Sequence, residues 1–299
     1  MCDTCRIYPR SETMAGDIIL HFLTISCPEV GRIFLSRKAP LKMTVMENNL
    51  LRKRGLPKSP DWHYFRIAEQ AFHANMAILQ NRSYSVAERE RAFLLFNRSL
   101  QDALDADNAT EAETLIEYFS APENYASLLQ SKLSAHLSSK VRLFRELCEV
   151  FLTRNQHSVV FRMFVASLQY IRSEDADMDA LSNTLRMFDG DEFQREQERL
   201  LAYLLFNHYL SDRLLDKSAN RNLFGQAVFI LTVFQFYRIF TAIFSVVEKN
   251  IVDLQTRSLI ISHLSRYFEH SQDEFHKQFV ILLEERQFYD MGFLFQLIS

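Results

Sequence analysis

The chain has 299 residues, enough for one large or two ordinary domains with a sizeable core. Hydrophobic residues make up 48% and charged residues 24%, which excludes an intrinsically disordered protein. The net charge is −3, although residues 1–60 carry ten Lys and Arg against five Asp and Glu. This modestly basic balance falls far short of the footprint of a nucleic-acid-binding protein. Six Gly and six Pro leave few residues for turns, which favours helices with short connections.

The first part of the chain differs from the rest in its proline content. Five of the six prolines fall within residues 1–60, so we expect a short irregular segment there that contains cysteines. Within it, the apolar and β-branched stretch Asp17 to Ser26 predicts either a strand or a buried turn of helix. Residues 41–60 are typical of an exposed linker. We therefore place a domain boundary between residues 1–60 and 61–299.

From residue 61 onward the apolar residues follow the helical period of 3.6. Asp61 is predicted to cap a helix that runs to about Gln80. Ser85 and Glu88 have the spacing of a capping box, as do Thr110 with Glu113 and Ser271 with Glu274. Further helices are predicted at about 85–105, 110–119, 123–136, 139–154, 157–172, 176–188, 191–215, 221–248, 251–268, 272–285 and 287–297. The sequence thus predicts an all-α fold, an irregular multi-helix bundle.

One stretch, Leu223 to Tyr237, is free of charge for fifteen residues and needs to be tested as a membrane span. Arg238 interrupts it, and Gln226 and Gln235 lie inside it, whereas a spanning helix needs about 20 apolar residues. We therefore expect a buried central helix and no membrane span. Five phenylalanines crowd this helix and predict a core packed with large side chains rather than a groove for a cofactor: Phe229, Phe234, Phe236, Phe240 and Phe244.

The strongest local signal for chemistry is the pair Cys2 and Cys5. Thiols with this spacing can bind one metal ion, and Cys27 is a possible third ligand. The alternatives are a redox pair, half of a zinc site, or cysteines with no metal. Cys148 is predicted to be a small buried hydrophobic residue. The polar first ten residues do not read as a signal peptide, so we expect a reducing cytoplasm, where clustered thiols commonly bind metals.

Other common catalytic motifs are missing from the sequence. There is no G-x-G-x-x-G, no P-loop, no H-E-x-x-H and no G-x-S-x-G. A Rossmann-type methyltransferase or dehydrogenase and a zincin are therefore not expected. Near the cysteines, Arg6 and Arg10 are predicted to offset thiolate charge or to hold an anionic group.

The string from Cys2 to Arg10 and the string from Leu23 to Arg32 together resemble the flagellin lysine-N-methylases of enteric bacteria. The stretch from Leu79 to Arg89 and the helix around Leu201 to Phe206 are similar to that family as well. The resemblance covers essentially the whole chain, and the two N-terminal strings are its most specific part.

The resemblance implies an enzyme that transfers methyl groups from S-adenosylmethionine to lysine ε-amines of flagellin. It also implies a cysteine-rich N-terminal module, with an iron–sulfur cluster, before a helical region. Cys2, Cys5 and Cys27 match family cysteines and are our predicted metal ligands. Arg6, Tyr8 and Arg10 match the string around them and are our predicted cofactor-binding residues.

Members of the family have further cysteines upstream of the position of Met1. We therefore expect residues 1–60 to be a remnant of the cysteine-rich module, and the chain to be an N-terminally truncated member. Three thiols alone do not close a four-thiolate cluster, so an inactive fragment is one expectation. Two alternatives remain, namely a non-enzymatic helical module that binds flagellin or another protein, and a metal-binding protein of other function.

Overall fold

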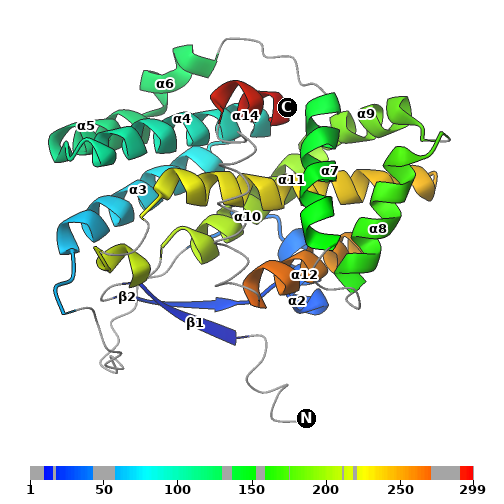
Figure 1. Cartoon of the computed structure of the whole chain (residues 1–299), viewed down its shortest axis with the longest axis horizontal. Coiled ribbons are helices and arrows are strands. Elements are labelled where there is room, and N and C mark those ends of the chain that lie inside the picture. Colours follow the sequence, from blue (N-terminus) through cyan, green and yellow to red (C-terminus); the bar gives the residue numbers. More distant parts are fainter. Residues whose placement is uncertain are drawn as a thin grey trace. The chain divides into compact units, whose positions relative to one another are not determined.

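The computed structural model describes residues 10–15, 18–42, 58–129, 137–152, 159–174, 176–210, 212–217, 221–270 and 290–298. Two strands come first, and every later element of the described chain is a helix (Figure 1). The elements in chain order are β1 (Arg10–Ala15), β2 (Ile18–Leu23), α2 (Pro28–Ser36), α3 (Trp62–Gln80), α4 (Val86–Asp105), α5 (Ala109–Ser120), α6 (Pro122–Leu129), α7 (Leu137–Leu152), α8 (Val159–Arg172), α9 (Met178–Met187), α10 (Asp191–His208), the 3-10 helix η1 (Asp212–Leu215), α11 (Leu223–Val247), α12 (Leu254–His270) and α14 (Met291–Leu297).

The predicted all-α fold is confirmed, and the first sixty residues hold more regular structure than expected. β1 and β2 form an antiparallel pair in which Arg10 lies opposite Leu23, so the strand alternative for this stretch is correct. The helix α2 was not predicted, although Pro28 at its first turn is a known start signal. One helix is shorter than predicted, since α10 ends at His208 instead of continuing to residue 215.

The chain folds as two compact units. The first unit holds the described parts of Met1–Leu23, Ala39–Lys132 and Glu198–Leu231. The second holds those of Thr24–Lys38, Leu133–Gln197 and Thr232–Ser299. Because these divisions fall inside α10 and α11, each of the two helices contributes residues to both units. The predicted boundary at residue 60 stays a prediction, since much of the segment around it lies outside the described residues.

The core of the first unit contains a buried cluster of neutral polar side chains. Asn97 on α4 donates from Nδ2 to Asn75 Oδ1 at 2.8 Å, and Asn75 on α3 donates back at 3.2 Å. The Tyr209 hydroxyl donates to Asn97 Oδ1 at 2.6 Å. Both asparagines are fully buried, and buried polar groups of this kind are stable only when they are hydrogen-bonded. The cluster therefore fixes α3, α4 and the residue that follows α10 to one another.

In the second unit, α2 packs closely against α12. A Cβ atom on Gly31 would lie only 2.8 Å from Ser258 Oγ, so glycine is required for this approach. The Ser258 hydroxyl donates to the carbonyl of Pro28, and Arg266 Nε donates to the carbonyl of Ser26 at 2.9 Å. The turn that precedes α2 is thereby attached to α12.

The apolar helix α11 is long and apolar enough to cross a membrane by length and composition, but 94% of its most apolar window is buried within the protein. This agrees with the predicted core helix. Four of the five phenylalanines noted above are at most 2% exposed, which confirms core packing there: Phe229, Phe234, Phe236 and Phe240. On the second unit's part of α11, Phe144 of α7 packs edge-on against Phe240, with ring centroids 5.1 Å apart.

Candidate functional site

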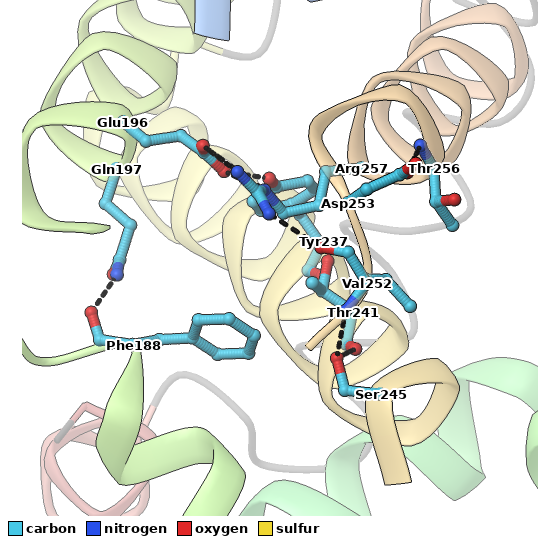
Figure 2. Close-up of polar contacts among 10 residues, drawn as sticks. All are labelled: Phe188, Glu196, Gln197, Tyr237, Thr241, Ser245, Val252, Asp253, Thr256 and Arg257. Atoms are coloured by element: carbon cyan, nitrogen blue, oxygen red, sulfur yellow. Dashed lines mark hydrogen bonds and ion pairs between the residues drawn. The ribbon is translucent and has the colours of Figure 1, made fainter. Parts of the chain in front are cut away.

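A buried polar centre lies in the second unit, where the start of α10, the second half of α11 and the start of α12 meet. Tyr237 and Thr241 are one turn apart on α11, so their side chains share one face of that helix. Glu196 and Gln197 come from α10, and Arg257 comes from α12 (Figure 2). All but Arg257, which is 13% exposed, are nearly inaccessible to solvent. Charged groups in such surroundings require partners.

The middle of this centre is a paired carboxylate. Arg257 Nε lies 3.1 Å from Glu196 Oε1, and Arg257 Nη2 lies 3.2 Å from Oε2, a bidentate arrangement that Figure 2 shows. The Tyr237 hydroxyl donates to the same Glu196 Oε1. Arg257 also donates to the carbonyl of Val252 at 2.7 Å, and its guanidinium lies over the ring of Phe193. Both oxygens of Glu196 are thus already in use.

The electrostatics of the pair keep Tyr237 protonated. Burial raises the pKa of its hydroxyl well above the ordinary value, and the negative charge of Glu196 raises it further. The hydroxyl therefore remains a hydrogen-bond donor throughout the physiological pH range. This geometry describes a structural ion pair, in which the carboxylate is not free to accept a proton from a substrate.

A second buried arginine lies next to this pair. Arg238, 1% exposed, donates from Nη2 to Asp189 Oδ1 at 2.6 Å and to the carbonyl of Leu185 at 3.3 Å. The Asp189 side chain is 40% exposed, so its charge is still hydrated while that of Arg238 is not. Two guanidinium nitrogens, Nε and Nη1, have no hydrogen-bond partner among the described residues.

A small pocket opens between these groups. Arg238, Gln197 and Thr241 contribute to its wall, and the remaining lining residues are Phe188, Phe193, Glu196 and Tyr237. Gln197 donates from Nε2 to the carbonyl of Phe188 (Figure 2), and its Oε1 has no partner among the described residues. The space holds about one water molecule. It is therefore far too small for a nucleoside cofactor.

In the first unit, the stretch Leu79 to Arg89 is organised around one buried carboxylate of α10. Arg82 Nε lies 2.5 Å from Glu198 Oε2, and Arg89 Nη1 lies 3.8 Å from the same oxygen. Arg89 also donates to the carbonyl of Leu79 at 2.8 Å. Burial lowers the pKa of Arg89, and the charge of Glu198 opposes that effect. These contacts attach the turn between α3 and α4 to α10.

The structure also tests the predicted helix caps. Ser85 and Glu88 form the predicted capping box, with the Ser85 N–H donating to Glu88 at 2.7 Å. Asp61 caps α3 as predicted, by accepting from the Tyr64 N–H at 3.1 Å. The cap predicted at Thr110 is wrong, because Asn108 takes that role for α5. The pair Ser271 and Glu274 lies outside the described residues.

Of the predicted metal ligands, only Cys27 lies within the described residues. It is half-buried, its thiol forms no disulfide within the described residues, and it occupies the N-cap position of α2 without capping the helix through its side chain. In the described part of the chain, no three His, Cys, Asp or Glu side chains are close enough together to hold a metal ion. Cys2 and Cys5 lie outside the described residues, so their convergence with Cys27 stays a prediction.

The predicted cofactor-binding residues lie at or before the first described residue of the chain. Arg6 and Tyr8 lie outside it, and Arg10 is described only as the first residue of β1. The structure therefore brings none of these three to a described site.

The sequence did not predict the polar centre of the second unit. One signal for it was available, since Arg238 is the first charge after a long apolar run, and a buried arginine requires acidic partners. Those partners lie on other helices, however, and helical periodicity does not identify which helices meet.

Comparison with known proteins identifies one family. The family model described as FliB lysine N-methylase C-terminal domain matches residues 74–297, about three quarters of the chain. No curated protein and no solved structure matches the sequence.

Proposed function

Because the chain belongs to the family of the FliB lysine N-methylase C-terminal domain, we propose that it acts in the methylation of lysine ε-amines of flagellin, with S-adenosylmethionine as methyl donor. The observation that carries this proposal is the family match, which extends from α3 to α14. The resemblance of the two N-terminal strings to flagellin methylases supports the choice of substrate and donor. We place the reaction in the cytoplasm.

The chemistry requires a neutral lysine amine held in line with the methyl group. S-adenosylmethionine, when bound, supplies that methyl group. The protein must then position the amine and help it to lose its proton, either with a general base or by removing it from water. Glu196 is unsuited to be that base, because Arg257 and Tyr237 occupy both of its oxygens.

The pocket beside Gln197 does not fit S-adenosylmethionine, since it has room for about one water molecule. We therefore assign no step of methyl transfer to this pocket.

A methylation assay tests the proposed function. Purified chain is incubated with flagellin and S-adenosylmethionine, and the intact mass of flagellin is followed over time. We expect increments of one methyl group that depend on both the chain and the donor, and none when the flagellin lysines are chemically blocked beforehand. Stable capture of flagellin without any mass increment would instead favour the non-enzymatic binding module.

We further propose that Cys2, Cys5 and Cys27 bind a metal centre of the iron–sulfur type. What supports this is the spacing of the first two thiols and the attachment to α12 of the residues on either side of Cys27, with Arg266 bonded to the carbonyl of Ser26 and Ser258 to that of Pro28. Such an attachment holds a ligand in place before metal binds.

Anaerobic purification followed by metal and sulfide analysis tests this second proposal independently of methylation. We expect bound iron and a visible absorption band, both lost in Cys27→Ser and both kept in the matched control Cys148→Ser. A colourless and metal-free protein that remains fully folded would contradict it.

A further inference from the structure

The polar centre of the second unit contains complementary groups that do not contact each other directly. Gln197 Oε1 is a buried acceptor, and Arg238 Nε and Nη1 are buried donors. Gln197 is 2% exposed and Arg238 is 1% exposed. All three atoms lack a protein partner among the described residues, and both side chains line the same pocket. A buried polar group without a partner destabilises the folded chain, so these atoms require an explanation.

The orientation of Gln197 is well determined by its neighbour. Its Nε2 donates to the carbonyl of Phe188, and the reverse orientation would place two carbonyl oxygens against each other. Oε1 therefore remains the free acceptor. The ligand that suits this pocket must donate a hydrogen bond to Gln197 and accept one from Arg238.

The size and charge of the pocket narrow the choice of ligand. It has room for about one water molecule. A cation would meet the guanidinium of Arg238, and an anion would meet Gln197 Oε1 and the carboxylate of Glu196. Only a small neutral molecule that both donates and accepts hydrogen bonds suits Gln197 Oε1 and a guanidinium nitrogen of Arg238 together.

We propose that this pocket is a hydration site, in which one ordered water molecule donates to Gln197 Oε1 and accepts from the guanidinium of Arg238. The water links α10 to α11 beside the Glu196–Arg257 pair. It is part of the folded structure, as buried waters with several polar partners generally are.

A crystal structure of the unaltered chain at a resolution that shows ordered water tests the proposal directly. We expect one water within hydrogen-bond distance of Gln197 Oε1 and of a nitrogen of Arg238. A dry pocket, or a direct hydrogen bond between the two side chains, would overturn it.

A measurement in solution provides a second test. Magnetic relaxation dispersion of water oxygen-17 counts water molecules that stay bound longer than the protein tumbles. We expect one fewer in Gln197→Met, and no change in Gln194→Met, a matched substitution on the same helix at a residue that does not line the pocket. An unchanged count in a folded Gln197→Met protein would count against the site.

Discussion

The asparagine cluster of the first unit and the Glu196 centre of the second solve the same problem, a polar group inside a helical core, in different ways. In the first unit, Asn75, Asn97 and Tyr209 are neutral and satisfy one another through direct hydrogen bonds. In the second unit, the centre around Glu196 is built from charges. A neutral network costs little desolvation, whereas a buried ion pair is stable only while both partners are present. The second centre should therefore be the more sensitive of the two to the loss of a single group.

The largest effect is expected at the carboxylate of the second unit. Replacing Glu196 with alanine leaves the guanidinium of Arg257 without its counter-charge and removes the acceptor of the Tyr237 hydroxyl. Breaking a buried pair in this way costs about 3–5 kcal/mol in the free energy of unfolding. Urea denaturation measures it, and a loss below about 1 kcal/mol would show that the pair is hydrated rather than buried.

The corresponding change in the first unit should cost less. Asn97→Ala removes the partner of Asn75 and Tyr209, and leaves both polar groups buried. We expect a loss of about 2–3 kcal/mol, because neutral groups carry a smaller desolvation penalty than charges. The same denaturation experiment measures it. If Asn97→Ala proved more costly than Glu196→Ala, the proposed difference between the two centres would be wrong.

A smaller effect is expected at alkaline pH, where the buried tyrosines of the two centres can be compared. Burial raises the pKa of both Tyr209 and Tyr237, and only Tyr237 also has a carboxylate beside it. Each tyrosine contributes stability that is fully present below the pKa of a tyrosine in the unfolded chain, about 10. This stability is lost as the pH rises above that value, since only the unfolded chain then releases the proton of the hydroxyl. Replacing either tyrosine with phenylalanine should make the free energy of unfolding fall less steeply with rising pH. Unfolding measured as a function of pH tests this, and identical slopes in all three proteins would refute it.

The smallest effect is expected at Arg238. Its partner Asp189 is 40% exposed and can be hydrated when the arginine is removed. Arg238→Met replaces a buried charge with an apolar side chain of similar length, so we expect the stability to change by less than about 1 kcal/mol. A loss as large as that of Glu196→Ala would mean that Arg238 belongs to the same cooperative network as the ion pair.

The sequence predicted the local features well. The Asp61 cap, the Ser85 capping box and the buried character of α11 all depend on residues close together in the chain, where helical periodicity and capping chemistry apply. The end of α10 was missed because Leu214 and Leu215 continue the apolar pattern even though the chain turns after His208. The helix α2 was not predicted, because the many prolines of residues 1–60 favour irregular structure.

The candidate site was not predicted, for a physical reason. Glu196, Tyr237 and Arg257 lie on three helices, and their meeting depends on how those helices pack rather than on any local pattern. Arg238 was visible as a charge at the end of an apolar run, but its partner Asp189 was not. Cys27 was predicted as a ligand because it matches a cysteine of the family that the chain resembles, and the structure adds the contacts that hold the residues on either side of it against α12.

Transfer of an isotopically labelled methyl group tests the central claim most directly. The chain is incubated with flagellin and S-adenosylmethionine that carries the label only in its methyl group, and the flagellin is then digested and its peptides analysed by mass spectrometry. We predict that the label appears on lysine side chains of flagellin. Label that is absent from lysine, while the chain is folded, would contradict a role as a lysine methylase.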